Sequence, residues 1–369
     1  MPFSDLRHRF QLTALLSGVL LLNGCALLVR FPAYPVPQET APSVFRGVYH
    51  VHTNYSHDSK ASLAKVIRTA RKAGLDFVVI TDHNTLAGAK AYQQMKADVL
   101  PLLIFGDEIS APDGHLTAIG IVQHPAPGQS SQEFVDEIHR QGGYAVIAHP
   151  TSRKKPWRNW QVKRVNGLEI YDFGHVFYSE NKLWVAAKVL FFPPAFFLKS
   201  FQKKSFSGLD LWREQLQGGP VAAFAAVDAH IHWQWWGLTP ENYLLAFQSV
   251  TMYALANELT PVKITEALGR GRSFIAFETW GIARNFSFLA HTNNENFGSG
   301  EKMTAESLIT FSVKVPAVGE IRFFHNGKMA KQAVGSELIT EAKGAGAYHV
   351  EIYRKGELWI LANPIYVES

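Results

Sequence analysis

The stretch HVHTNYSHDS at 50–59 concentrates side chains that bind metal ions, and ITDHN at 80–84 adds another histidine. His50 and His52 stand two positions apart, so on an extended strand both project from the same face. Two imidazoles on one face can reach the same metal ion, and Asp58 follows shortly afterwards. The spacing therefore predicts a metal site at the end of a strand.

Other polar side chains of the same kind follow further apolar stretches. Each stretch is typical of a buried strand, and the polar residues come where that strand should end. The nine candidate ligands are His50, His52, Asp58, His83, Glu108, His115, His149, Asp228 and His230. All offer nitrogen or oxygen atoms, which suit Zn, Mn or Fe. The one cysteine, Cys25, lies near the N-terminus, so we expect no thiolate ligand.

The elements that must position these residues alternate between strands and helices from 44 to 277. Helical spacing of apolar residues over 63–75 separates the strands expected at 44–49 and 77–81. Further strands are expected at 99–105, 116–122, 144–148, 167–171, 221–227 and 273–277, and helices at 86–98, 131–141 and 260–269. This order predicts an α/β barrel with a parallel sheet, whose active site is built at the C-terminal ends of the strands.

The pattern changes at about 285 to closely spaced strands. FSFLA at 286–290, LITFSVKV at 308–315, EIRFFHNG at 320–327 and the stretch 347–363 carry it. Asn326-Gly327 and Lys355-Gly356 are typical of hairpin turns. We therefore expect a barrel over 44–284 and a small β-sandwich over 285–369.

The motifs HVH, TDH, AHP and DAH occur in this order, each at an expected strand end. With them the chain resembles the PHP superfamily, named for polymerase and histidinol phosphatase, over about 45–280. The resemblance implies a distorted (β/α)7 barrel with two or three divalent metal ions at the C-terminal ends of its strands. Members of the superfamily are mostly phosphoesterases.

The resemblance also implies how the ligands are shared. A first metal would take His50, His52 and Asp228, a second His115 and His149, and a third Asp58, His83 and His230, with Glu108 bridging the first two. His57 is the alternative to Asp58. Glu108, Asp228 and His83 would act in catalysis together with hydroxide from metal-bound water. Asp82 and His232 are expected just behind the ligands, and Glu169 either supports a ligand histidine or lies on the surface.

The N-terminus is typical of an export signal. Arg7 and Arg9 precede the uncharged run 12–22, and LLNGC at 21–25 resembles a bacterial lipobox. We expect a signal peptide over 1–24, lipidation of Cys25 and a proline-rich tether over 25–43. An uncleaved anchor and plain secretion are the alternatives. All three place the folded part outside the cytoplasm, as a periplasmic or outer-surface protein of the cell envelope.

Composition limits the partners without identifying them. The 369 residues are 47% hydrophobic and 18% charged, which is typical of a globular protein, and the net charge of +5 modestly favours anionic partners. Arg153, Lys154 and Arg270 are candidate phosphate contacts, although 152–164 also fits a solvated loop. The aromatic insertion 183–201 fits either core packing or a hairpin lying on a membrane surface.

These observations predict an envelope-anchored, metal-dependent hydrolase that cleaves phosphoesters. Its expected partners are a phosphorylated small molecule or a lipid headgroup, and a membrane through Cys25, with no nucleic-acid duplex. Two alternatives stay open. One is a metal-dependent hydrolase of an amide-type bond, and the other is an envelope binding protein without catalysis.

Overall fold

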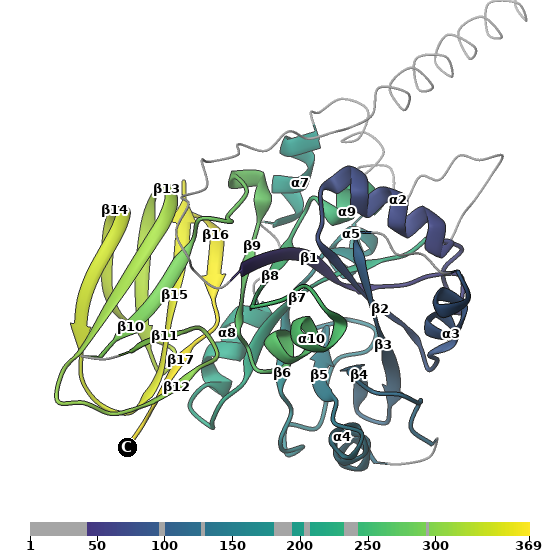
Figure 1. Cartoon of the computed structure of the whole chain (residues 1–369), viewed down its shortest axis with the longest axis horizontal. Coiled ribbons are helices and arrows are strands. Elements are labelled where there is room, and N and C mark those ends of the chain that lie inside the picture. The colour runs from purple at the N-terminus through teal and green to yellow at the C-terminus, as the bar shows by residue number, and fades with distance from the viewer. Residues whose placement is uncertain are drawn as a thin grey trace, which may run out of the picture.

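The computed structural model describes residues 43–95, 100–126, 130–180, 194–202, 207–231, 243–292 and 295–369. Seven strands pair in sequence from β1 to β7, and β7 returns to β1, which closes a barrel (Figure 1). The strands are β1 (Ser43–Val51), β2 (Phe77–His83), β3 (Leu102–Ala111), β4 (Gly114–Ile119), β5 (Tyr144–Ala148), β6 (Gly167–Asp172) and β7 (Ala222–Ala229). The predicted seven-stranded α/β barrel with extra C-terminal strands is confirmed.

The barrel is not entirely parallel, which corrects the prediction of a parallel sheet. Strand β4 runs antiparallel to both of its neighbours, β3 and β5. Strands β3 and β4 are joined by a tight turn, with Ala111 opposite Gly114. The chain therefore turns back on itself here instead of crossing over through a helix.

Helices cover the barrel on its outer side (Figure 1). They are α2 (Leu63–Ala73), α3 (Ala87–Gln94), α4 (Ser131–Arg140), α5 (Phe173–Ser179), α7 (Pro194–Gln202), α8 (Ser207–Gln215), α9 (Tyr243–Phe247) and α10 (Pro261–Gly269). The sequence sets their ends: the Ser62 hydroxyl accepts a hydrogen bond from the first turn of α2, and Gly74 ends that helix at φ 69°. Ser130 and Glu133 form a capping box on α4.

Two strands extend the barrel sheet toward the C-terminal strands. Strand β8 (Thr251–Ala256) pairs antiparallel with β1, β9 (Ser273–Ala276) pairs with β8, and β16 pairs with β9. The C-terminal strands are β10 (Ser287–His291), β11 (Asn296–Gly298), β12 (Lys302–Thr304), β13 (Ile309–His325), β14 (Lys328–Ala342), β15 (Gly346–Arg354), β16 (Glu357–Ala362) and β17 (Ile365–Glu368). The strands predicted at 308–315 and 320–327 are one long strand, β13, whose pairing with β14 is irregular between Lys314 and Gly319.

Two hydrophobic clusters lie inside the molecule. One fills the barrel and the space beneath its helices, and the other lies within the C-terminal strands around Phe311, Phe323 and Trp359. Leu198 and Phe201 of α7 belong to the barrel cluster, so this end of the predicted aromatic insertion packs in the core. Residues 183–193 of that segment, Cys25 with the predicted signal and most of the tether, and His232 lie outside the described residues. Within the described residues, no helix is both long and apolar enough to cross a membrane.

Candidate metal centre

The predicted ligands meet at one rim of the barrel because parallel strands end there together. His50 lies in β1 near its C-terminal end, and the backbone N–H of His52 donates to the Ala229 carbonyl of β7 at 3.2 Å. His50, His149 and Asp228 have φ values of 67°, 28° and 41°. Non-glycine residues rarely adopt this left-handed conformation, and in proteins it is concentrated at functional sites. The backbone is thus strained at the points where these side chains converge.

A first group of side chains surrounds the end of β1. His50, His52, Glu108 and Asp228 each offer a ligand atom, and these atoms lie within 4.8 Å of one another. His50 Nε2 is 2.9 Å from Glu108 Oε2, and His52 Nε2 is 3.1 Å from the same oxygen. Asp228 Oδ1 is 3.6 Å from His50 Nε2 and 3.3 Å from His52 Nε2. Two imidazoles and two carboxylates therefore lie close enough together to bind one metal ion.

Glu108 connects this group to a second one. Its other oxygen, Oε1, lies 2.6 Å from His115 Nδ1 and 2.9 Å from His149 Nε2. His83, Glu108 and His115 also form a group whose ligand atoms lie within 4.8 Å of one another. One carboxylate thus presents each of its oxygens to a different set of histidines, which is the arrangement needed to bridge two cations.

The antiparallel strand β4 explains how His115 reaches the rim despite its short spacing from Glu108. His115 stands at the beginning of β4, opposite Ser110 near the end of β3. Since β4 runs in the reverse direction, its first residues lie at the rim where the parallel strands end. The sequence could predict that His115 is a ligand candidate but not this reversal.

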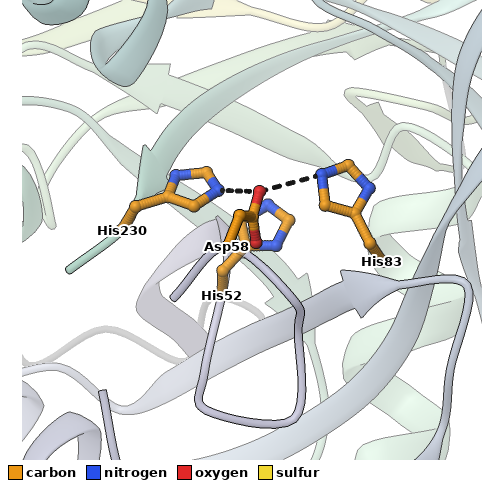
Figure 2. Close-up of side chains that lie close together, drawn as sticks. All are labelled: His52, Asp58, His83 and His230. Atoms are coloured by element: carbon orange, nitrogen blue, oxygen red, sulfur yellow. Dashed lines mark hydrogen bonds and ion pairs between the residues drawn. The ribbon is translucent and has the colours of Figure 1, made fainter. Parts of the chain in front are cut away.

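A third group is formed by His52, Asp58, His83 and His230, whose side chains lie close together (Figure 2). Asp58 Oδ2 is 3.2 Å from His83 Nε2 and 3.0 Å from His230 Nε2, and His52 completes the set. His57 is exposed and contacts the His83 ring at a centroid distance of 5.0 Å. Of these two alternatives, the structure therefore brings Asp58 into the cluster.

Supporting contacts are made by the Nδ1 atoms of two histidines, His50 and His52. Glu169 is buried, and its Oε1 accepts from His50 Nδ1 at 2.7 Å. The Ser56 hydroxyl donates to Asp58 at 2.6 Å, so its oxygen is left to accept from His52 Nδ1 at 3.4 Å. When Nδ1 is the donor on both rings, Nε2 is the atom that faces the carboxylates and could bind a cation.

These observations test whether the residues fit a metal. His52 Nε2 is buried and has no hydrogen-bond partner among the described residues, yet it faces oxygens of Glu108 and Asp228. A buried nitrogen without a donor to accept from is costly unless a cation fills the space before it. The donor set of imidazole nitrogen and carboxylate oxygen fits Zn, Mn or Fe.

The pKa shifts of the residues at the rim also favour a cation site. Burial disfavours the charged form of Glu108, but His50, His115 and His149 beside it hold its pKa well below the usual range. Burial lowers the pKa of His149, but Glu108 outweighs it and raises that pKa to about 9. The pKa of His230 is raised to about 9 against burial by Asp228 and Asp58. The three carboxylates therefore require positive charge close by, which protons on histidine or divalent cations can supply.

The phosphate contacts predicted from sequence separate into two places. Arg153 and Lys154 are exposed, and their charges act on His175 together with His149 and Asp228, so they lie beside the rim. Arg270 does not lie beside the rim. The backbone carbonyl of its neighbour Arg272 accepts a hydrogen bond from the Leu255 N–H, and Leu255 pairs with Val44 at the start of β1. The predicted phosphate role of Arg270 in this site is wrong, because the residue lies at the opposite end of the barrel, where it pairs with Glu266.

Two supporting residues were not predicted from the sequence. The Thr53 N–H and hydroxyl donate to the carboxylate of Asp82 at 2.5 and 2.6 Å, which fixes the loop after β1 against β2. The Tyr243 hydroxyl lies 2.6 Å from the His52 carbonyl and 2.7 Å from that of Ala229. Thr53 directly follows HVH and could have been considered, whereas Tyr243 carries no spacing signal.

Comparison with known proteins gives a match to the PHP domain family over residues 49–182. An uncharacterised protein of Methanocaldococcus jannaschii is 29% identical over 113 residues, which cover 28% of this chain and 66% of that protein.

Solved structures also resemble the chain. A two-domain protein of Bacteroides vulgatus containing a predicted PHP-like metal-dependent phosphoesterase is 13% identical, with a TM-score of 0.43, over 91% of this chain and 99% of that one. An amidohydrolase of Chromobacterium violaceum with bound sulfate and no metal is 14% identical, with a TM-score of 0.32, over 49% of this chain and 86% of that one. The family match and the ligand groups together support a metal-dependent hydrolase.

Proposed function

We propose that this chain, whose residues 49–182 match the PHP domain family, is a metal-dependent phosphoesterase. The observation that carries the proposal is the placement of Glu108 between two sets of histidines, with one oxygen facing each set. Two cations held on either side of one carboxylate suit a reaction in which attacking and leaving oxygens must both be stabilised.

The residues of the rim have distinct tasks in this proposal. His50, His52, Asp228 and Glu108 would hold one cation, Glu108 with His115 and His149 another, and Asp58 with His83 and His230 a third. Such ions supply hydroxide near neutral pH by lowering the pKa of bound water, and they neutralise phosphate charge. Glu169 keeps the His50 ring oriented through Nδ1, and its Oε2 accepts from the His149 backbone N–H at 2.6 Å.

A phosphoester is favoured over an amide because of the basic loop beside the rim. Trp157 is buried and its backbone N–H donates to the Pro150 carbonyl, while the backbone N–H of Arg158 donates to the Asp113 carbonyl in the β3–β4 turn. The loop that carries Arg153 and Lys154 is therefore anchored next to the ligands. Exposed cations held there attract an anionic substrate, which a neutral amide does not require.

The test combines elemental analysis of the purified full chain with a substrate panel. We expect at least one tightly bound divalent metal and chelator-sensitive release of phosphate from a phosphoester. Hydrolysis of amide-type substrates without phosphate release would replace this proposal with the amide alternative. A chain that binds no divalent metal would support the non-catalytic binding protein instead.

We also propose that the protein is anchored in the cell envelope through a lipidated Cys25. Support comes from the sequence LLNGC after an apolar run. Intact mass of the wild type should show a lipid adduct, and Cys25→Ser should leave an unlipidated precursor or released protein. An unmodified mass together with unchanged fractionation would favour an uncleaved anchor.

A lipid anchor would hold the site close to a membrane. We therefore propose that the substrate is a phosphorylated small molecule or an anionic lipid headgroup. The phosphoester panel should therefore offer soluble monoesters and the same headgroups on vesicles. Faster release from vesicles by the lipidated chain, but not by Cys25→Ser, indicates a membrane substrate. Equal rates on soluble esters indicate a small molecule.

A further inference from the structure

The C-terminal strands end in one long open edge. Strand β14, with 15 residues, pairs with β13 and with no other strand among the described residues (Figure 1). Strands β11 and β12 also pair on one side only, but each has 3 residues. Folded proteins usually keep open edges short, because unpaired N–H and C=O groups invite another strand. The length of β14 is therefore unusual for an edge that faces only water.

The same strand exposes large apolar side chains. Met329, Val334 and Ile339 are 55%, 75% and 70% exposed. They are spread along the strand, near its beginning, middle and end, while Leu338 between them is buried in the C-terminal core. This strand thus offers both unpaired backbone groups and apolar contacts along its whole length.

The charges of β14 are ordered along its direction. Its basic residues, Lys328 and Lys331, lie in the first half, and its acidic residues, Glu337 and Glu341, lie in the second half. When two such strands run antiparallel, the basic half of one meets the acidic half of the other. A parallel arrangement would instead place like charges opposite each other, which is unfavourable in a sheet.

From this order we propose that β14 pairs antiparallel with β14 of a second copy of the chain, about a two-fold axis near Val334. In that register Val334 meets its own counterpart, Met329 meets Ile339, and Lys331 meets Glu337. The exposed apolar residues and the opposite charges are matched at once, as a self-complementary two-fold interface requires. The C-terminal strands of the two copies then continue one another. This inference does not depend on the reaction proposed above.

The test is the mass of the full chain by sedimentation equilibrium in density-matched detergent. We expect a dimer for the wild type. Lys331→Glu should raise the dimer dissociation constant about tenfold or more, because two like-charged pairs replace two attractive ones. Glu337→Lys should do the same, and the double variant should restore the wild-type value. Val334→Lys should also weaken the dimer.

Matched controls lie on the barrel, where Val262 is 72% exposed and Arg68 is exposed on α2. Val262→Lys and Arg68→Glu should leave the dissociation constant unchanged. Circular dichroism shows whether each variant is folded. A wild-type monomer overturns the proposal, as does a dimer that the β14 variants leave intact. Failure of the double variant to recover association would overturn the antiparallel register.

Discussion

Strand β1 carries buried charge at both of its ends, and the two clusters differ in how that charge is balanced. Near its start, the Arg46 guanidinium pairs with both oxygens of Glu278, with Nε to Oε1 at 2.6 Å, and their side chains are 3% and 0% exposed. Arg46 also donates to the Ala73 carbonyl, and the Tyr253 hydroxyl donates to Glu278. Near its end, His50 and His52 face the carboxylates of Glu108 and Asp228.

The first cluster is complete within the chain, whereas the second is not. Arg46 is permanently charged and neutralises Glu278 at every accessible pH. At the rim, three carboxylates face only histidines, so the balance of charge depends on protons on those histidines or on added cations. The contrast indicates that charge at the start of β1 is balanced within the fold, whereas the residues at its end are compatible with bound divalent metals.

The strongest test of this contrast is Glu108→Gln. Removing the charge that faces both sets of histidines should lower metal affinity and turnover by at least about 100-fold, since even outer partners of metal ligands contribute 10–100-fold. Elemental analysis and phosphate release measure both effects, and circular dichroism should be unchanged. Glu214→Gln on the exposed side of α8 is the control. Full metal content in Glu108→Gln would exclude this residue from the site.

At the other end of β1, Arg46→Met should reduce the free energy of unfolding by about 3–5 kcal/mol, because Glu278 is left buried without its partner. Urea denaturation measures the loss. Metal content per folded molecule should not change, which separates this cluster from the rim. A loss of metal with unchanged stability would reverse the two roles.

A second buried cluster in which the charges are balanced within the chain consists of Glu351, His349 and Arg213. Its contribution to stability should depend on pH. Burial raises the pKa of Glu351, but His349 and Arg213 outweigh it and hold that pKa at about 2. Its folded pKa is below the usual 4.5, so its stabilisation is present above pH 4.5 and is lost as pH falls toward 2. The difference in unfolding free energy between wild type and Glu351→Gln should therefore shrink by about 3 kcal/mol over this range.

Urea titrations at several pH values measure that difference, with Glu306→Gln in an exposed loop as the control. A difference that stays constant from pH 5 to pH 2 would show that Glu351 is not held ionised by its partners.

The smallest expected effect is that of Glu169, which orients the candidate metal ligand His50. Glu169→Gln keeps the size of the side chain but weakens its bond to His50 Nδ1, so metal affinity should fall about 10- to 100-fold. Competition with a chelator of known affinity measures it, and Glu137→Gln on α4 is the control. An unchanged affinity would place Glu169 among residues that serve the fold alone.

Local features of the sequence predicted much of this molecule. Strand ends were visible because apolar stretches stop where polar ligands begin, as at His83, His149 and Asp228. The change to closely spaced strands near 285 also predicted the second region. Prediction failed where direction mattered: β4 runs antiparallel, and the strands predicted at 308–315 and 320–327 are one strand with an irregular pairing.

The sequence by itself determined which residue types stand at strand ends, and therefore the chemistry of nitrogen and oxygen ligands at one rim of an α/β barrel. Only the tertiary structure decided which of them meet. Arg270 and Arg153 look alike as basic residues near strands, yet they lie at opposite ends of the barrel. Glu169 is a buried partner of His50 rather than a surface residue. The reason is that strand order, direction and closure arise from contacts between distant segments, which spacing along the chain does not record.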